Sequence, residues 1–251
     1  MHNPSIPADH RLIVALDYPT WEQAAELVDK LDNVTFFKVG LEMFLSSRGE
    51  AVTELRRRNK KIFLDLKFHD IPNTVAQACR QIAHLGVDIC NVHALGGSKM
   101  MAQAEAALTQ QATELNINRP ALIAVTILTS MAEDDLDQVG LETQPAANVT
   151  RLAKLTREAG LDGVVASPQE ISLIRQACGE EFLIICPGVR PQGAALGDQK
   201  RVMTPGAAIK LGADYLVVGR PITQAPNPAE AAAAILKEIN TALTEAAQSS
   251  I

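Results

Sequence analysis

The chain has 251 residues, of which 47% are apolar but only 4% aromatic, so its core must be built mainly from aliphatic side chains. Its net charge of −6 argues against a protein that coats nucleic acid, because binding to phosphates regardless of sequence needs a basic surface. The four cysteines show no CxxC spacing, and no apolar signal segment opens the chain. We therefore expect a soluble, cytoplasmic protein with no membrane segment, in which the cysteines are buried free thiols.

Short apolar segments alternate with longer segments of helical periodicity eight times along the chain. The apolar segments lack polar alternation, which is typical of parallel strands covered on both faces. The predicted strands span residues 11–17, 35–40, 61–67, 89–94, 121–128, 163–167, 182–188 and 215–220. The predicted helices span residues 20–31, 46–58, 73–85, 98–113, 148–159, 168–178, 205–211 and 228–247.

Eight consecutive strand–helix units predict an α/β fold of the (β/α)8 TIM-barrel type, with eight parallel strands. We expect one domain over residues 1–251, with its core at 11–248, since barrels of roughly 250 residues are ordinary. A doubly wound open sheet is the alternative. It usually has fewer strands and a glycine-rich first turn, whereas residues 17–20 here read DYPT.

Charged residues end the first three predicted strands, at the carboxyl ends where barrel active sites lie. Asp17 closes the first strand, Lys38 lies near the end of the second, and Asp65 and Lys67 lie in the third. Charges within apolar strands are costly unless they are paired. Ordinary rim salt bridges could explain any one of these residues. Together with Asp70, just past the third strand, they predict an array of alternating charge that can stabilise a carbanion.

A second group of residues follows the seventh and eighth strands, where barrels often bind phosphate. Gly219 lets a backbone N–H approach an anion closely, and Arg220 offers a planar guanidinium. Residues 188–204 show neither helical nor strand period and contain Arg190 and Gln199. Because loops of this length are usually functional, we predict a phosphate-binding lid at 188–204. A solvated basic loop is the alternative.

Other polar residues near strand ends give weaker signals. Thr129 and Ser130 can bond a ligand ring or cap the following turn, and their spacing leaves both possibilities open. His69 and His93 lack metal-ligand spacing, so we interpret both as structural. The chain contains neither a GxGxxG nor a GxSxG motif, so nothing indicates a nicotinamide cofactor or a serine hydrolase.

Residues 63–74, FLDLKFHDIPNT, resemble the signature of the orotidine 5′-phosphate decarboxylase family. The DxKxxD core alone is shared with sugar-phosphate lyases of the same superfamily, so the longer string and the lid sequence carry the resemblance, which covers about residues 11–240. The other matching motifs are VALD at 14–17, KVG at 38–40, VTILTS at 125–130, PGVRP at 187–191, GDQ at 197–199, RVMTP at 201–205 and VGRPI at 218–222.

This resemblance implies decarboxylation of orotidine 5′-monophosphate to uridine 5′-monophosphate and CO2, the last step of de novo UMP biosynthesis, without a cofactor or metal. It also implies a homodimer with its sites at the interface, where Asp70, Ile71 and Thr74 reach the partner's site. Lys67 would stabilise and protonate the ring carbanion, and Asp65 and Asp70 would hold it in place.

The resemblance also assigns the substrate-binding residues. Lys38 and Asp17 would bind ribose hydroxyls, and Thr129 would contact the pyrimidine ring. The complete set is Asp17, Lys38, Asp65, Ile71, Thr74, Thr129, Ser130, Pro187, Arg190, Gln199, Gly219 and Arg220. Two alternatives stay open: a magnesium-dependent keto-sugar-phosphate lyase of the same superfamily, and a nucleotide-binding barrel without turnover.

Overall fold

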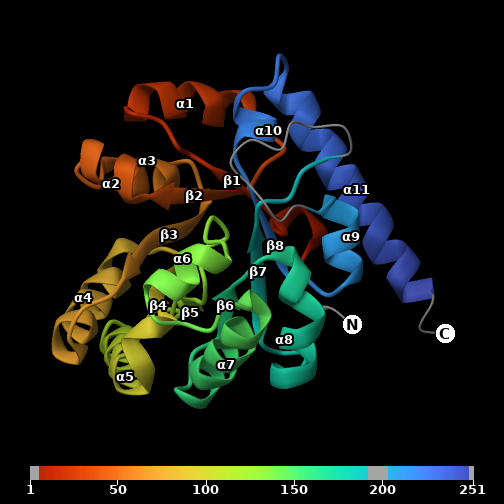
Figure 1. The fold of residues 1–251 in the computed structure, drawn as a ribbon. Coiled ribbons are helices and arrows are strands. Elements are labelled where there is room, and N and C mark those ends of the chain that lie inside the picture. Colours follow the sequence, from red (N-terminus) through yellow and green to blue (C-terminus); the bar gives the residue numbers. More distant parts are fainter. Residues whose placement is uncertain (1–5, 192–202, 249–251) are drawn as a thin grey trace.

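Eight parallel strands close into a barrel in which neighbours follow chain order from β1 to β8 and β8 pairs back with β1. The computed structural model describes residues 6–191 and 203–248. The strands are β1 (Leu12–Ala15), β2 (Phe36–Gly40), β3 (Lys61–Phe68), β4 (Ile89–His93), β5 (Ala121–Val125), β6 (Gly163–Val165), β7 (Leu183–Pro187) and β8 (Tyr215–Val218). This topology confirms the predicted (β/α)8 barrel (Figure 1).

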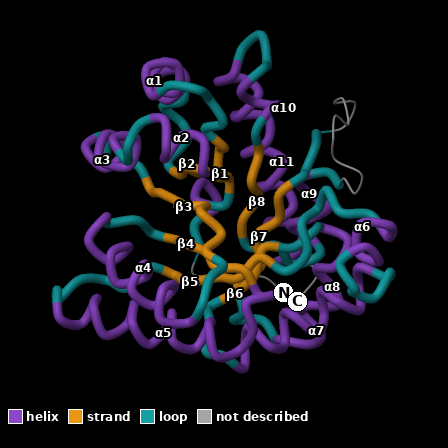
Figure 2. Tube along the Cα trace, turned by 60° about the vertical axis from the view of Figure 1, so that its left-hand side comes forward, coloured by secondary structure: helices purple, strands orange, loops and turns teal. Residues whose placement is uncertain are grey.

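Helices surround the strands as an outer layer (Figure 1; Figure 2). They are α1 (Trp21–Lys30), α2 (Leu41–Ser46), α3 (Glu50–Arg57), α4 (Pro72–Leu85), α5 (Gly97–Glu114), α6 (Glu133–Gln138), α7 (Pro145–Glu158), α8 (Ile171–Cys178), α9 (Pro205–Lys210), α10 (Arg220–Thr223) and α11 (Pro228–Gln248). Short 3₁₀ helices are η1 (Ala8–His10), η2 (Ala94–Gly96) and η3 (Pro168–Glu170). In the described part of the chain, no helix is long and apolar enough to cross a membrane.

The structure corrects several predicted boundaries. The helix predicted over 46–58 begins later, as α3 at Glu50, because Gly49 adopts a left-handed φ of +82° just before it. The short helices α2, α6 and α10 are not predicted from periodicity. Strand β1 ends at Ala15 and β5 at Val125, earlier than predicted, so Asp17 and Thr129 lie in the loops that follow these strands.

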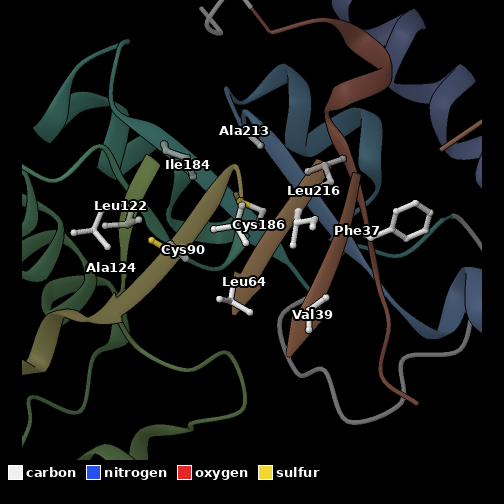
Figure 3. Packing of buried hydrophobic residues seen from close by; sticks show 14 of the residues in the cluster. Phe37, Val39, Leu64, Cys90, Leu122, Ala124, Ile184, Cys186, Ala213 and Leu216 are labelled. Atoms are coloured by element: carbon white, nitrogen blue, oxygen red, sulfur yellow. The ribbon is translucent and has the colours of Figure 1, made fainter. Parts of the chain in front are cut away.

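Alternate strand residues face the barrel interior and the surrounding helices, which divides the core into two layers. The interior layer consists of Ile13, Ala15, Phe36, Phe63, Ile89, Ile123, Ile185 and Val217. The outer layer lies between strands and helices, and Figure 3 labels some of it: Phe37, Val39, Leu64, Cys90, Leu122, Ala124, Ile184, Cys186, Ala213 and Leu216. All four cysteines are buried free thiols, as expected, and burial raises the pKa of Cys79 to about 12.

Three aspartates link neighbouring strands at the amino-terminal end of the barrel. Each directly precedes a strand, accepts a hydrogen bond from a backbone N–H of the preceding strand, and pairs with a cation. The sets are Asp88 with Ile62 and Lys61, Asp162 with Leu122 and Arg119, and Asp214 with Ile184 and Arg175. This end of the barrel is thus a scaffold, opposite the end where the predicted site lies.

Candidate active site

One layer above the apolar interior, towards the carboxyl ends of the strands, the inward positions become polar. Lys38, Asp65 and Asn91 each come two residues after an interior side chain of β2, β3 or β4, so they point to the same interior. All three are buried. The apolar layer beneath them excludes water from one side, which strengthens the electrostatic interactions among them.

Four charges of alternating sign meet in this layer. The Lys38 Nζ lies 3.0 Å from Asp17 Oδ1 and 3.5 Å from Asp65 Oδ2, and Lys67 Nζ lies 2.8 Å from Asp65 Oδ1. The inner pair, Lys38 and Asp65, is buried, whereas the side chain of Asp17 is 63% exposed and that of Lys67 is 34% exposed. The four residues converge as their strand positions lead us to expect, and Lys67 is the more exposed of the two lysines.

Each buried charge in the array is held in its ionised form by its neighbours. Burial alone would lower the pKa of Lys38, but the charges of Asp65 and Asp17 outweigh it and raise that pKa. Burial alone would raise the pKa of Asp65, but Lys38, Lys67 and a hydrogen bond from Asn91 lower it. At neutral pH the buried inner pair, Lys38 and Asp65, is therefore fully charged.

The segment that carries Asp65 and Lys67 is not a regular strand. Leu64 pairs with Cys90 and Phe68 pairs with Val92, so an advance of four residues along β3 matches an advance of only two along β4. Within this bulge Lys67 adopts a left-handed φ of +52°. A bulge re-aims side chains beside functional sites, and a left-handed lysine persists only where its surroundings fix it.

Asn91 is the site residue that sequence reasoning misses. Its side chain is 1% exposed, its Nδ2 donates to Asp65 Oδ1 at 2.7 Å, and its Oδ1 accepts from the Lys67 backbone N–H at 2.8 Å. The available signal was a lone amide at an inward position of an apolar strand, where a polar group needs partners.

Asp70 and its neighbours lie outside the array. Asp70 is exposed in the loop after β3, where its Oδ1 accepts from the Ile71 N–H at 2.6 Å. Across the described ranges 6–191 and 203–248, it forms no ion pair with Lys67. Ile71 and Thr74 are exposed at the start of α4. Of the two carboxylates in the DxKxxD motif, Asp65 therefore contacts Lys67 of the same chain, whereas Asp70 lies at the surface.

Two arginines lie together at the ends of β7 and β8. Arg190 is buried and donates to the Val189 carbonyl at 3.0 Å, while burial and then the charge of Arg220 lower its pKa. Gly219 precedes α10, and a Cβ on it would lie 3.8 Å from Asp17 Oδ2, so this corner adjoins the charge array. Two neighbouring guanidiniums favour a bound anion.

The remaining predicted residues line the same end of the barrel. Pro187 is the last residue of β7, and Thr129 and Ser130 lie in the loop after β5. Gln199, with most of the predicted lid, lies outside the described residues.

The two histidines near the array are packed against each other. The rings of His69 and His93 stack with centroids 5.4 Å apart. Burial, with the nearby His69 and Lys67, lowers the pKa of His93 to about 4, so this ring is neutral. Among the described residues no group of three His, Cys, Asp or Glu side chains could hold a metal ion. The structural interpretation of both histidines stays a prediction.

Comparison with known proteins gives consistent results. Residues 10–235 match the family described as "Orotidine 5′-phosphate decarboxylase / HUMPS family". A protein of Moorella thermoacetica called orotidine 5′-phosphate decarboxylase is 53% identical over 92% of this chain and 93% of its own length. A protein of the same name from Haemophilus influenzae is 52% identical over 93% of this chain and 98% of its own length.

Solved structures agree with this assignment. The crystal structure of orotidine 5′-phosphate decarboxylase from Lactobacillus acidophilus superposes with a TM-score of 0.82 at 40% identity, and covers 92% of this chain and 99% of that one. The crystal structure of an uncharacterized conserved protein from Geobacillus kaustophilus gives a TM-score of 0.79 at 36% identity, and covers 91% of this chain and 99% of that one. The family match spans most of the chain, and the relatives are well above 30% identical. The chain therefore belongs to the orotidine 5′-phosphate decarboxylase / HUMPS family.

Proposed function

We propose that the chain decarboxylates orotidine 5′-monophosphate to uridine 5′-monophosphate and CO2, which makes it a carboxy-lyase of UMP biosynthesis. The observation that carries the proposal is the array of alternating charge formed by Asp17, Lys38, Asp65 and Lys67, whose inner pair, Lys38 and Asp65, is buried. Loss of CO2 from the pyrimidine leaves an electron pair on ring carbon six, and fixed charges in a water-excluding site are the largest available means of stabilising it. The relatives named for this reaction support it.

In the proposed mechanism Lys67 acts twice. As the bond between ring carbon six and the carboxylate breaks, CO2 leaves and the electron pair stays on the ring, where the Lys67 ammonium stabilises it. Lys67 then gives a proton to that carbon and regains one from water, so no electron acceptor is needed. Asp65, ionised and 2.8 Å from Lys67, orients the ammonium and repels the substrate carboxylate before it departs.

The rest of the substrate would be held on either side of the reacting carbon. Asp17 and Lys38 would bind the ribose hydroxyls, and Thr129 and Ser130 the pyrimidine ring. The phosphate would lie against Arg190, Gly219 and Arg220, beside Pro187. Gln199 stays a prediction for the phosphate contact. Binding energy from this remote phosphate can be used to dehydrate the site and hold the ring near the array.

Lys38 distinguishes this function from that of a magnesium-dependent lyase. Its ammonium already lies between the carboxylates of Asp17 and Asp65, at 3.0 and 3.5 Å, where a divalent cation would have to compete with it. We expect the purified chain to convert orotidine 5′-monophosphate at an unchanged rate after dialysis against a chelator, followed by ultraviolet absorbance. Activity that collapses in chelator and returns with Mg2+ would point to the lyase; binding without conversion would point to a non-catalytic barrel.

Replacing Arg220 by alanine tests the phosphate site separately. Because a hydrogen bond to a charged group contributes about 1.5–3 kcal/mol, Arg220→Ala should raise KM by roughly 10- to 100-fold, with a smaller effect on kcat. The control is Arg57→Ala, since the Arg57 side chain is exposed on α3 and pairs only with Glu54 among the described residues. An unchanged KM in Arg220→Ala would contradict the assignment.

We also propose a homodimer with its sites at the interface. Large apolar side chains are exposed where three adjacent strands end: Ile71 after β3, Leu95 after β4 and Leu128 after β5. A second copy over this rim would cover them and bring Asp70, Ile71 and Thr74 to its own site. We place the protein in the cytoplasm, since its buried free thiols fit a reducing compartment.

A further inference from the structure

We propose that Asn91 is a positioning residue for Lys67, which it holds in place from the neighbouring strand. The inference rests on the proposed decarboxylase function, because it assigns a role in that reaction to a residue that does not itself touch the reacting carbon. The motif around Asp65 and Lys67 lies on β3, whereas Asn91 lies on β4.

The geometry shows why β3 needs a partner at this point. Its bulge takes Lys67 out of the regular backbone ladder and into a left-handed conformation, which disfavours any residue with a Cβ. The amide of Asn91 replaces the missing ladder acceptor, since its Oδ1 accepts the Lys67 N–H at 2.8 Å. This bond fixes the backbone from which the lysine side chain extends.

The other end of the same amide fixes the carboxylate that Lys67 contacts. Asn91 Nδ2 donates to Asp65 Oδ1 at 2.7 Å, and the same oxygen lies 2.8 Å from Lys67 Nζ. One buried side chain therefore sets both the backbone of the lysine and its counter-ion. Since a neutral amide adds no charge, its contribution is the direction of the ammonium rather than the field of the array.

The test compares Asn91→Ala and Asn91→Asp with the wild-type chain. Alanine removes both hydrogen bonds. Aspartate is nearly isosteric and keeps an acceptor for the Lys67 N–H, but it replaces the donor with a second carboxylate beside Asp65, so alanine alone separates a loss of positioning from a change in charge. Misplacing a reacting group by about 1 Å can lower a rate by about 100-fold, and we expect a loss in kcat of that order in both variants. KM should change little, because the phosphate corner at Arg190 and Arg220 is untouched.

Asn148 provides the matched control. It is also a fully buried asparagine, it bonds the Glu142 carbonyl and Arg151 on α7, and it lies outside the site. Asn148→Ala should lose stability yet keep the wild-type kcat. A folded Asn91 variant with wild-type kcat, or one that changes KM alone, overturns the proposal. So does an Asn148→Ala variant that loses kcat as strongly, because the effect would then be one of general destabilisation.

A crystal structure of the Asn91→Ala variant separates this inference from the proposed function. We expect Lys67 Nζ to move away from Asp65 when the amide is gone; an unmoved lysine overturns the positioning role. If the wild-type chain fails to convert orotidine 5′-monophosphate, the decarboxylase function is wrong, whereas the displacement of Lys67 still decides whether Asn91 positions it.

Discussion

Replacing Lys67 by alanine is expected to lower kcat for decarboxylation of orotidine 5′-monophosphate by roughly 10,000-fold or more. In the proposed mechanism the loss combines two contributions, because the same ammonium would stabilise the electron pair on the ring and would supply the proton. Nothing else in the array can replace it: Lys38 is buried between Asp17 and Asp65. Steady-state kinetics by ultraviolet absorbance, with circular dichroism to confirm the fold, measure the effect.

Lys61 is the control for this substitution. It lies on the same strand, β3, but at the opposite end of the barrel, where its Nζ pairs with Asp88 at 2.7 Å. Lys61→Ala removes an ammonium of the same kind without touching the array and should keep the wild-type kcat. If Lys67→Ala kept the kcat of Lys61→Ala, Lys67 would have no catalytic role.

The largest effect on stability is expected at the other end of the barrel. The carboxylate of Asp214 is fully buried, contacts Arg175 at 2.5 Å and the Ile184 N–H at 2.8 Å, and lies 4.0 Å from the buried guanidinium of Arg11. Asp214→Asn keeps the shape but removes the negative charge that lies against Arg175 and Arg11. Breaking a buried ion pair in this way costs about 3–5 kcal/mol of unfolding free energy, which urea denaturation can measure.

The repeated arrangement at this end supplies a matched comparison. Asp88 occupies the same position before β4 as Asp214 does before β8, but its side chain is 32% exposed. Asp88→Asn should therefore cost only about 1–2 kcal/mol, since water and ions screen the exposed pair. Equal losses in the two variants would show that burial does not set the strength of these pairs.

Much of the fold and the array could be predicted from the sequence because their signals are local. Strand and helix periods alternate along the chain, and the charges of Lys38, Asp65 and Lys67 interrupt apolar strands where a charge is costly. Once strand order follows chain order, those charges must meet at one end. The start of α3 after Gly49 could not be predicted, because a single glycine ends some helices and lies within others.

What could not be predicted depends on register between strands. The β3 bulge follows from how Leu64 and Phe68 pair with β4, and no pattern within β3 alone reveals it. Asn91 matters only because of that bulge, and as a neutral residue it gives little signal by itself. Asp70 is adjacent to the array in sequence, yet the turn after β3 leaves it at the surface, and no local pattern reveals this.

In the proposed reaction Lys67, held by Asp65, drives decarboxylation of orotidine 5′-monophosphate. The most direct test is release of labelled CO2 from substrate labelled in its carboxylate, measured side by side for the wild-type chain and Lys67→Ala in the presence of a chelator. We predict equal amounts of labelled CO2 and uridine 5′-monophosphate from the wild type and none above background from the variant. Equal release from both proteins would show that Lys67 does not drive the reaction, and no release from either would show that the chain is not a decarboxylase.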